Sequence, residues 1–257
     1  MERAEFDEYS ERLAAWAAEA DGVLGLVLVG STAATAHAPD GWSDHDFFVV
    51  AEPRSAEPLR ARTDWLPRRG AGIALHERDT AHGAWVVFDD GHLLEYAVFA
   101  PDEVGLSRSG ALRVAVDRAG GLAERMAPTL APPTRDPRTL ATSLHRALLV
   151  GAGRGARGER LVARRHLLDA AGALLGLVAA LRGADDAQDP WRRVERTEPE
   201  LAAALDGILA RGDAGAALAL ADLAAEVAGA EPWWPSALAA AVRPRLVTAG
   251  RGARPRG

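Results

Sequence analysis

The stretch Val23–Val50, VLGLVLVGSTAATAHAPDGWSDHDFFVV, constrains the fold of this chain more than any other part of it. Its first seven residues, Val23–Val29, are apolar and predict a buried strand, which Gly30 and Ser31 end with a turn. A short Ala-rich helical turn and a Pro-Asp-Gly loop follow, and a second strand opens at Asp44–Asp46. The sequence therefore predicts a strand–turn–strand unit around which a sheet is built.

The two aspartates of this unit are placed to bind metal. Side chains alternate between the faces of a strand, so Asp44 and Asp46 point to one face and His45 points to the other, where we expect a structural role. Carboxylates about 6–7 Å apart, at roughly 3.3 Å of rise per residue, can share divalent ions. Gly30 lets the backbone approach a ligand, and the helical turn that begins at Ser31 has free N–H groups that suit phosphate. This combination indicates nucleotide chemistry.

The pattern Gly30-Ser31, twelve residues, Asp44-x-Asp46 resembles the signature of the DNA polymerase beta-like nucleotidyltransferase superfamily. It looks most like the small antibiotic nucleotidyltransferases that act on aminoglycosides and lincosamides. The resemblance covers the first half of the chain firmly and the second half loosely. The family carries a third carboxylate on a neighbouring strand, for which Glu95 is the candidate.

The resemblance implies a function and a set of site residues. The expected reaction transfers a nucleoside monophosphate to a hydroxyl of a small molecule, and AMP from ATP is the first candidate. Two Mg²⁺ ions would be held by Asp44, Asp46 and Glu95. The nucleotide would bind at Gly30, Ser31 and the two aspartates. The implied partners are ATP or another nucleoside triphosphate and a small hydroxyl-bearing acceptor.

Both parts of the carboxylate motif have simpler interpretations. Acidic residues two apart are common on solvated loops, but Phe47–Val50 is apolar on both faces and so predicts a buried strand directly after Asp46. Glu95 lies between Leu94 and Tyr96, and a buried carboxylate needs a cation or a hydrogen-bond donor. If its strand neighbours that of the aspartates, a cross-strand gap of about 5 Å gathers all three carboxylates. The alternative is an edge-strand glutamate that faces water.

A fourth acidic residue, Glu159, follows a glycine-rich stretch and begins the longest predicted helix, Glu159–Leu181. The glycines of that stretch, which predict a loop, are Gly151, Gly153, Gly155 and Gly158. In antibiotic nucleotidyltransferases a glutamate of the helical domain can act as general base on the acceptor hydroxyl, and Glu159 looks similar. Acidic residues also favour helix N-termini by about 0.3–1 kcal/mol through the helix dipole. Both interpretations stay open at this point.

The rest of the first half alternates between helices and strands. Helices are predicted over Glu2–Ala18 and Pro58–Trp65. Four further strands are predicted: Gly72–His76, Ala84–Phe88, His92–Ala100 and Arg113–Val116. The expected fold class is an α/β (α+β) nucleotidyltransferase domain with a small mixed sheet that helices cover on one side, followed by an α-helical domain.

The second half contains helical patterns only. These are Thr139–Val150, Glu159–Leu181, Pro199–Ala210, Ala214–Ala228 and Pro235–Val242. We therefore expect a nucleotidyltransferase domain at 1–127, a Pro-rich linker at 128–137, an α-helical substrate-binding domain at 138–248 and a disordered tail at 249–257.

Composition narrows the class of protein. A net charge of −6 argues against general nucleic-acid binding, which needs a basic surface. The absence of cysteine excludes disulfides, thiolate metal sites and cysteine nucleophiles. No run approaches the roughly 20 apolar residues of a membrane span, and the N-terminus lacks an apolar signal core, so we expect a cytoplasmic protein without a membrane partner.

Two other functions fit the same residues. The chain could modify a protein, as antitoxin-type nucleotidyltransferases of this superfamily do, although a second domain favours a small acceptor. It could instead be a non-catalytic module that binds nucleotide, although clustered carboxylates would then serve no purpose. The sequence predicts neither the nucleobase nor the acceptor nor the oligomeric state.

Overall fold

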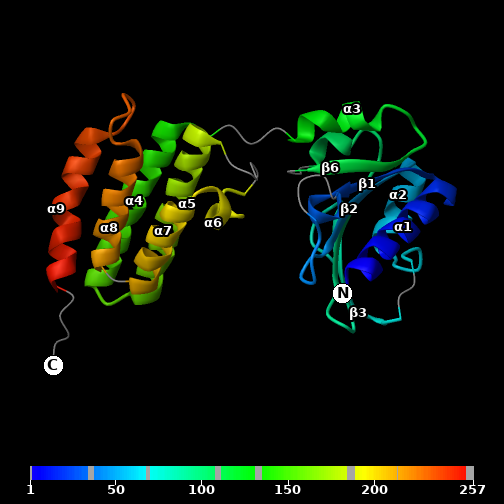
Figure 1. Cartoon of the computed structure of the whole chain (residues 1–257), viewed down its shortest axis with the longest axis horizontal. Helices are drawn as coiled ribbons and strands as arrows, with labels where there is room; N and C mark the ends of the chain where they lie inside the picture. The colour runs from blue at the N-terminus through cyan, green and yellow to red at the C-terminus, as the bar shows by residue number, and fades with distance from the viewer. Residues whose placement is uncertain are drawn as a thin grey trace. The chain divides into compact units, whose positions relative to one another are not determined.

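A computed structural model describes residues 2–33, 38–67, 70–107, 111–130, 135–183, 189–212 and 214–252. The chain divides into two compact units, Met1–Pro132 and Pro133–Gly257. The first contains a mixed six-stranded sheet with helices, and the second is helical, which confirms the predicted mixed sheet followed by a helical region (Figure 1).

The first unit contains every strand that the sequence predicts. The strands are β1 (Val23–Val29), β2 (His45–Ala51), β3 (Ile73–Arg78), β4 (Gly83–Phe88), β5 (Leu93–Phe99) and β6 (Leu112–Asp117). The helices are α1 (Arg3–Glu19), α2 (Pro53–Ala61) and α3 (Leu122–Met126). Three 3₁₀ turns complete the unit: η1 (Gly30–Ala33), η2 (Val104–Leu106) and η3 (Ala127–Leu130).

The order of the strands in the sheet is β3-β4-β5-β2-β1-β6. β2 and β5 run parallel, whereas the other neighbouring pairs of described strands run antiparallel. Parallel neighbours need a long crossover, which α2, β3 and β4 provide here. Because β2 and β5 are parallel, their N-terminal ends lie at the same end of the sheet.

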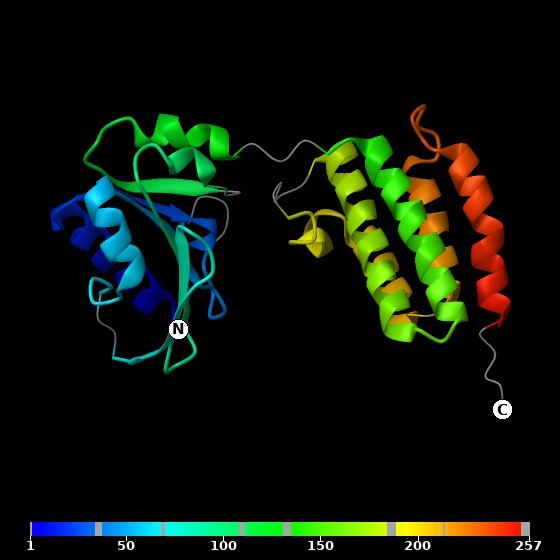
Figure 2. The ribbon, with the colours of Figure 1, turned by 180° about the vertical axis from the view of Figure 1, so that it is seen from behind.

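Helices pack on both faces of this sheet, so the prediction that they cover one side only is wrong. On one face, Tyr9 and Leu13 of α1 are fully buried in a cluster with Phe47. On the other face, Leu122 and Met126 of α3 are buried in a second cluster. Figure 2 shows α1 and α2 close together and α3 apart from them. The sequence did not predict α3 because the helix is only five residues long.

The described part of the second unit is built from helices. They are α4 (Pro137–Ala156), α5 (Arg160–Arg182), α6 (Val194–Thr197), α7 (Pro199–Arg211), α8 (Ala214–Ala228) and α9 (Ser236–Gly252). Leucines and alanines from α4, α5, α7, α8 and α9 form one core. None of the helices in the described ranges is long and apolar enough to cross a lipid bilayer.

The predicted glycine-rich loop is mostly helix, because α4 continues through Gly151, Gly153 and Gly155 to Ala156. A glycine costs a helix interior roughly 1 kcal/mol relative to alanine. At Gly151, however, an added Cβ would lie 2.9 Å from the Cβ of His166 on α5. Close packing of α4 against α5 thus requires a glycine where local propensity predicted a break.

The predicted boundaries of two helices are wrong because a proline lies inside each of them. α2 begins with Pro53 at its first turn and continues through Pro58, where the sequence predicted its start. α9 continues through Pro244 to Gly252, past its predicted end at Val242. Residues 249–252 of the expected tail are therefore helical, and residues 253–257 lie outside the described part of the chain.

The predicted linker, residues 128–137, contains ordered ends. η3 includes its first residues, and Pro137 occupies the first turn of α4. Asp136 caps that helix by accepting a hydrogen bond from the backbone N–H of Thr139 at 3.0 Å. Residues 131–134 lie outside the described part of the chain.

Candidate metal centre

The three predicted carboxylates lie together near the N-terminal ends of β2 and β5. Asp46 on β2 is the register partner of Glu95 on β5, and Asp44 directly precedes β2. One carboxylate oxygen from each of the three residues lies within 4.8 Å of the others. The predicted cluster is thus confirmed, and its hard oxygen atoms could hold a divalent metal ion.

His45 lies on the opposite face, and its structural role is confirmed. Its side chain is fully buried and stacks on Phe6 of α1 at 3.8 Å between ring centroids. Its Nε2 lies 3.1 Å from the carbonyl oxygen of Phe6, which can only accept, so Nε2 carries the proton. Nδ1 then accepts from Nε2 of His92 at 2.8 Å. The first bond holds the beginning of β2 against α1, and the second connects it with His92, directly before β5.

The turn after β1 approaches the cluster closely. Gly30 has a φ of +56°, which side chains rarely adopt. A Cβ at this position would lie 2.9 Å from Oδ2 of Asp46. Glycine is therefore needed both for the backbone and for the place of the neighbouring carboxylate. The next residue, Ser31, donates a long hydrogen bond of 3.4 Å from its hydroxyl to the backbone carbonyl of Asp44.

Sequence reasoning did not find Thr32, the third residue of this turn. Its side chain is buried, and its hydroxyl accepts a hydrogen bond from the backbone N–H of Asp46 at 3.0 Å. The same hydroxyl donates to the backbone carbonyl of Asp44 at 3.4 Å. Its signal in the sequence is a hydroxyl residue directly after Gly-Ser in an Ala-rich segment.

Glu95 differs from both of its expected environments. β5 lies between β4 and β2, so Glu95 is not on an edge strand. Its side chain is nevertheless exposed, so the expected burial is wrong. Partial desolvation, and then the nearby negative charges of Asp44 and Asp79, raise the pKa of Glu95. A divalent cation among these carboxylates would relieve the repulsion.

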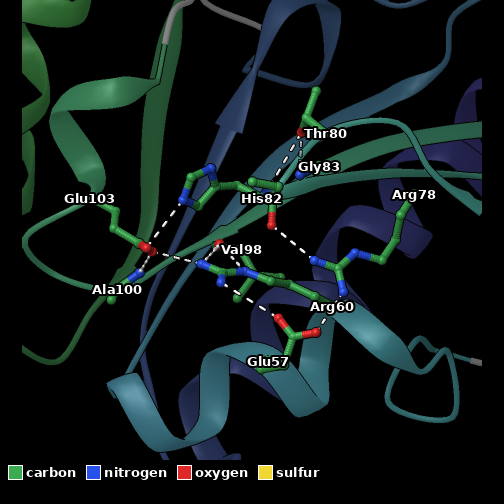
Figure 3. Close-up of polar contacts among 10 residues, drawn as sticks. Glu57, Arg60, Arg78, Thr80, His82, Gly83, Val98, Ala100 and Glu103 are labelled. Carbon is green, nitrogen blue, oxygen red and sulfur yellow. Dashed lines mark hydrogen bonds and ion pairs between the residues drawn. The ribbon is translucent and has the colours of Figure 1, made fainter.

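A polar network fixes the other end of β5 (Figure 3). Arg60 of α2 donates to the carbonyl oxygen of Val98 at 2.9 and 2.7 Å, and to Glu103 at 2.6 Å. Glu103 also accepts from the backbone N–H of Ala100 at 2.8 Å and lies 3.1 Å from Nε2 of His82. The strand that carries the third carboxylate is thereby tied to α2 and to the turn before β4.

Acid should unfold the first unit partly through this network. The hydrogen bond from the Ala100 N–H, and then those from His82 and Arg60, lower the pKa of Glu103 below its ordinary value of 4.5. The stabilisation by the ionised carboxylate is therefore fully present above that value and is lost as the pH falls through the lower folded-state pKa. We expect Glu103→Gln to flatten the decline of Tm below about pH 4.5.

Thermal melts from about pH 6 to about pH 3 measure this effect. Glu77→Gln removes an exposed glutamate of β3 and is the matched control, with the acid slope of the wild type. Equal acid slopes for the wild type and Glu103→Gln would show that the network does not respond to pH.

Glu159 belongs to the second unit, separate from the unit that carries the three carboxylates. It precedes the first residue of α5 and forms ion pairs with Arg154 at 2.9 Å and Arg157 at 3.1 Å. Hydrogen bonds from Arg157, and then from Arg154, lower the pKa of Glu159. A lowered pKa weakens a carboxylate as a general base near neutral pH. Its catalytic role stays a prediction.

No protein-family model matches the chain, and no curated protein matches it either. The chemistry of the site therefore has to be judged from its geometry. The cluster of Asp44, Asp46 and Glu95 beside a tight glycine turn is compatible with a catalytic metal site.

Proposed function

We propose that this chain is a nucleotidyltransferase of the DNA polymerase beta-like type. It would transfer a nucleoside monophosphate to a hydroxyl of a small molecule such as an aminoglycoside or a lincosamide, and AMP from ATP is the first candidate. The observation that carries the proposal is the gathering of Asp44, Asp46 and Glu95 at the beginnings of two adjacent strands, with the turn at Gly30 close to Asp46. The Gly-Ser-x12-Asp-x-Asp signature supports the same assignment.

The carboxylates would hold two Mg²⁺ ions, since Mg²⁺ prefers hard oxygen ligands. Asp44, Asp46 and Glu95 would hold them, because each offers a carboxylate oxygen to the cluster. When bound, the ions lower the pKa of the acceptor hydroxyl and neutralise charge on the departing pyrophosphate. The contribution of the protein is to fix the carboxylates at the right separation before substrate arrives.

The turn at Gly30 and Ser31 would bind the triphosphate. Because Gly30 has no side chain, the backbone of this turn can lie close to Asp46 and to a ligand bound there. The half-buried hydroxyl of Ser31 can turn from its long bond with the Asp44 carbonyl and donate to a phosphate oxygen. The helical unit, within the predicted boundaries 138–248, would bind the acceptor, and the net charge of −6 suits a cationic one.

Glu159→Gln separates the two roles of Glu159. The paired arginines and the lowered pKa favour a role at the helix terminus, so we expect a slightly lower Tm and a kcat close to that of the wild type. A general base would instead contribute about 10²–10⁴ in rate, and the lost activity would recover as the pH rises. Steady-state kinetics at several pH values decide between the two roles.

Pyrophosphate release tests the function itself. The full chain is incubated with ATP, GTP, CTP or UTP, a panel of aminoglycosides, lincosamides and other hydroxyl compounds, and Mg²⁺ or EDTA. We expect release that needs both Mg²⁺ and an acceptor, and a product that is heavier by one nucleoside monophosphate. Labelling of added protein substrates alone would favour the protein-modifying alternative. Nucleotide binding without any release would favour a non-catalytic module.

A further inference from the structure

Two neighbouring hydroxyls bind the same backbone carbonyl beside the carboxylate cluster. The carbonyl of Asp44 accepts from Ser31 at 3.4 Å and from Thr32 at 3.4 Å. The hydroxyl of Thr32 also accepts a hydrogen bond from the backbone N–H of Asp46, at 3.0 Å. The two hydroxyls differ in access, because Ser31 is half-buried whereas the side chain of Thr32 is only 2% exposed.

Thr32 makes these bonds where the sheet itself no longer can. β1 pairs with β2 as far as Val29 opposite Asp46, and η1 then continues beside the beginning of β2. The hydroxyl of Thr32 accepts a hydrogen bond from the backbone N–H of Asp46 and donates one to the backbone carbonyl of Asp44. The backbone between the two metal-binding side chains is therefore held from η1.

We propose that Thr32 is a positioning residue that sets the separation of the Asp44 and Asp46 carboxylates, and that it thereby frees Ser31 to bind phosphate. When a nucleotide binds, Ser31 exchanges its bond with the Asp44 carbonyl for one with a phosphate oxygen. The carbonyl keeps a donor, because Thr32 remains. Thr32 thus acts on metal affinity and Ser31 on nucleotide affinity. This division rests on the proposed function.

Conservative variants separate the hydroxyl of Thr32 from its volume. Thr32→Val keeps the shape and removes the hydroxyl, whereas Thr32→Ser keeps the hydroxyl and removes a methyl group. Ser31→Ala removes the neighbouring hydroxyl and leaves both bonds of Thr32 in place. All variants are made in the full chain.

Mn²⁺ binding without nucleotide is measured by calorimetry and by electron paramagnetic resonance. We expect Thr32→Val to weaken Mn²⁺ binding by about 10–100-fold, the usual effect of losing a group that orients metal ligands. Thr32→Ser should stay close to the wild type. Ser31→Ala should bind Mn²⁺ like the wild type but bind ATP about 10-fold more weakly, since it loses a hydrogen bond to a charged group. In transfer, Thr32→Val should lower kcat while the KM for ATP changes little.

Three results would overturn the proposal. Thr32→Val with wild-type Mn²⁺ affinity would remove the positioning role. Thr32→Ser as weak as Thr32→Val would show that volume matters and the hydroxyl does not. Ser31→Ala with the metal defect of Thr32→Val would remove the division between the two hydroxyls. A wild type that binds no Mn²⁺ would refute the metal site of the proposed function, and the role of Thr32 with it.

A measurement on the wild type covers the case in which Thr32→Val does not fold. Hydrogen exchange of the Asp46 amide, followed by NMR, reports directly on its bond with Thr32. We expect slow exchange that stays slow when ATP is added. Fast exchange of this amide in the folded protein would overturn the proposal without any variant.

Discussion

Replacing either Asp44 or Asp46 by asparagine abolishes transfer and leaves the first unit folded: this is the expected result with the largest effect. Each substitution removes one negative charge from a cluster whose oxygens lie within 4.8 Å of one another. Metal ligation stabilises the transition state by several kcal/mol, so the rate should fall about 10³-fold or more. Pyrophosphate release with Mg²⁺ measures the loss.

The same variants should melt no lower than the wild type in EDTA, because they relieve repulsion among the carboxylates. Asp79→Asn is the matched control, since it removes a charge that raises the pKa of Glu95 but lies outside the cluster. We expect it to retain turnover. Near-normal turnover in Asp44→Asn or Asp46→Asn would remove the central claim of a metal-dependent site.

Gly30→Ala should lower turnover about 100-fold through the displacement of a single carboxylate, since a misplacement of about 1 Å can cost that much. The new Cβ would lie 2.9 Å from Oδ2 of Asp46, which is closer than van der Waals contact, so we expect this carboxylate to shift. Mn²⁺ affinity should fall together with kcat. Calorimetry and steady-state kinetics measure the two quantities.

Gly120→Ala separates this displacement from simple backbone strain. Gly120 has a φ of +78°, and no heavy atom lies within 4 Å of a Cβ built there. Both variants should lose stability, because a side chain at positive φ costs roughly 1–2 kcal/mol. Only Gly30→Ala should lose metal binding. Equal Mn²⁺ affinities in the two variants would mean that Asp46 adjusts without cost.

The sequence predicted those parts of the site that depend on local periodicity. The alternation of side chains in a strand placed Asp44 and Asp46 on one face and His45 on the other, whatever the rest of the sheet does. The neighbouring place of Glu95 followed from the family resemblance, and the register of β2 with β5 bears it out. The exposure of Glu95 was not predictable, because it depends on which elements cover that end of the sheet.

Tertiary packing decided the features that sequence reasoning missed. Gly151 suggested a loop but lies inside α4. A glycine is found there because the close approach of His166 excludes a larger residue. Thr32 looked like part of an ordinary turn, and only the path of η1 beside β2 brings its hydroxyl to Asp46. Such contacts join segments that are separated along the chain, so no local pattern announces them.

The parallel pairing of β2 with β5 also affects when the site can form as the chain is synthesised. Both aspartates are synthesised before Glu95, and the two strands that pair beside them, β1 and β2, also precede it in the chain. β5 reaches β2 only after a long crossover closes, which costs more entropy than a hairpin does. The third carboxylate therefore arrives last, and an unfinished chain lacks the complete set of ligands to capture a metal ion.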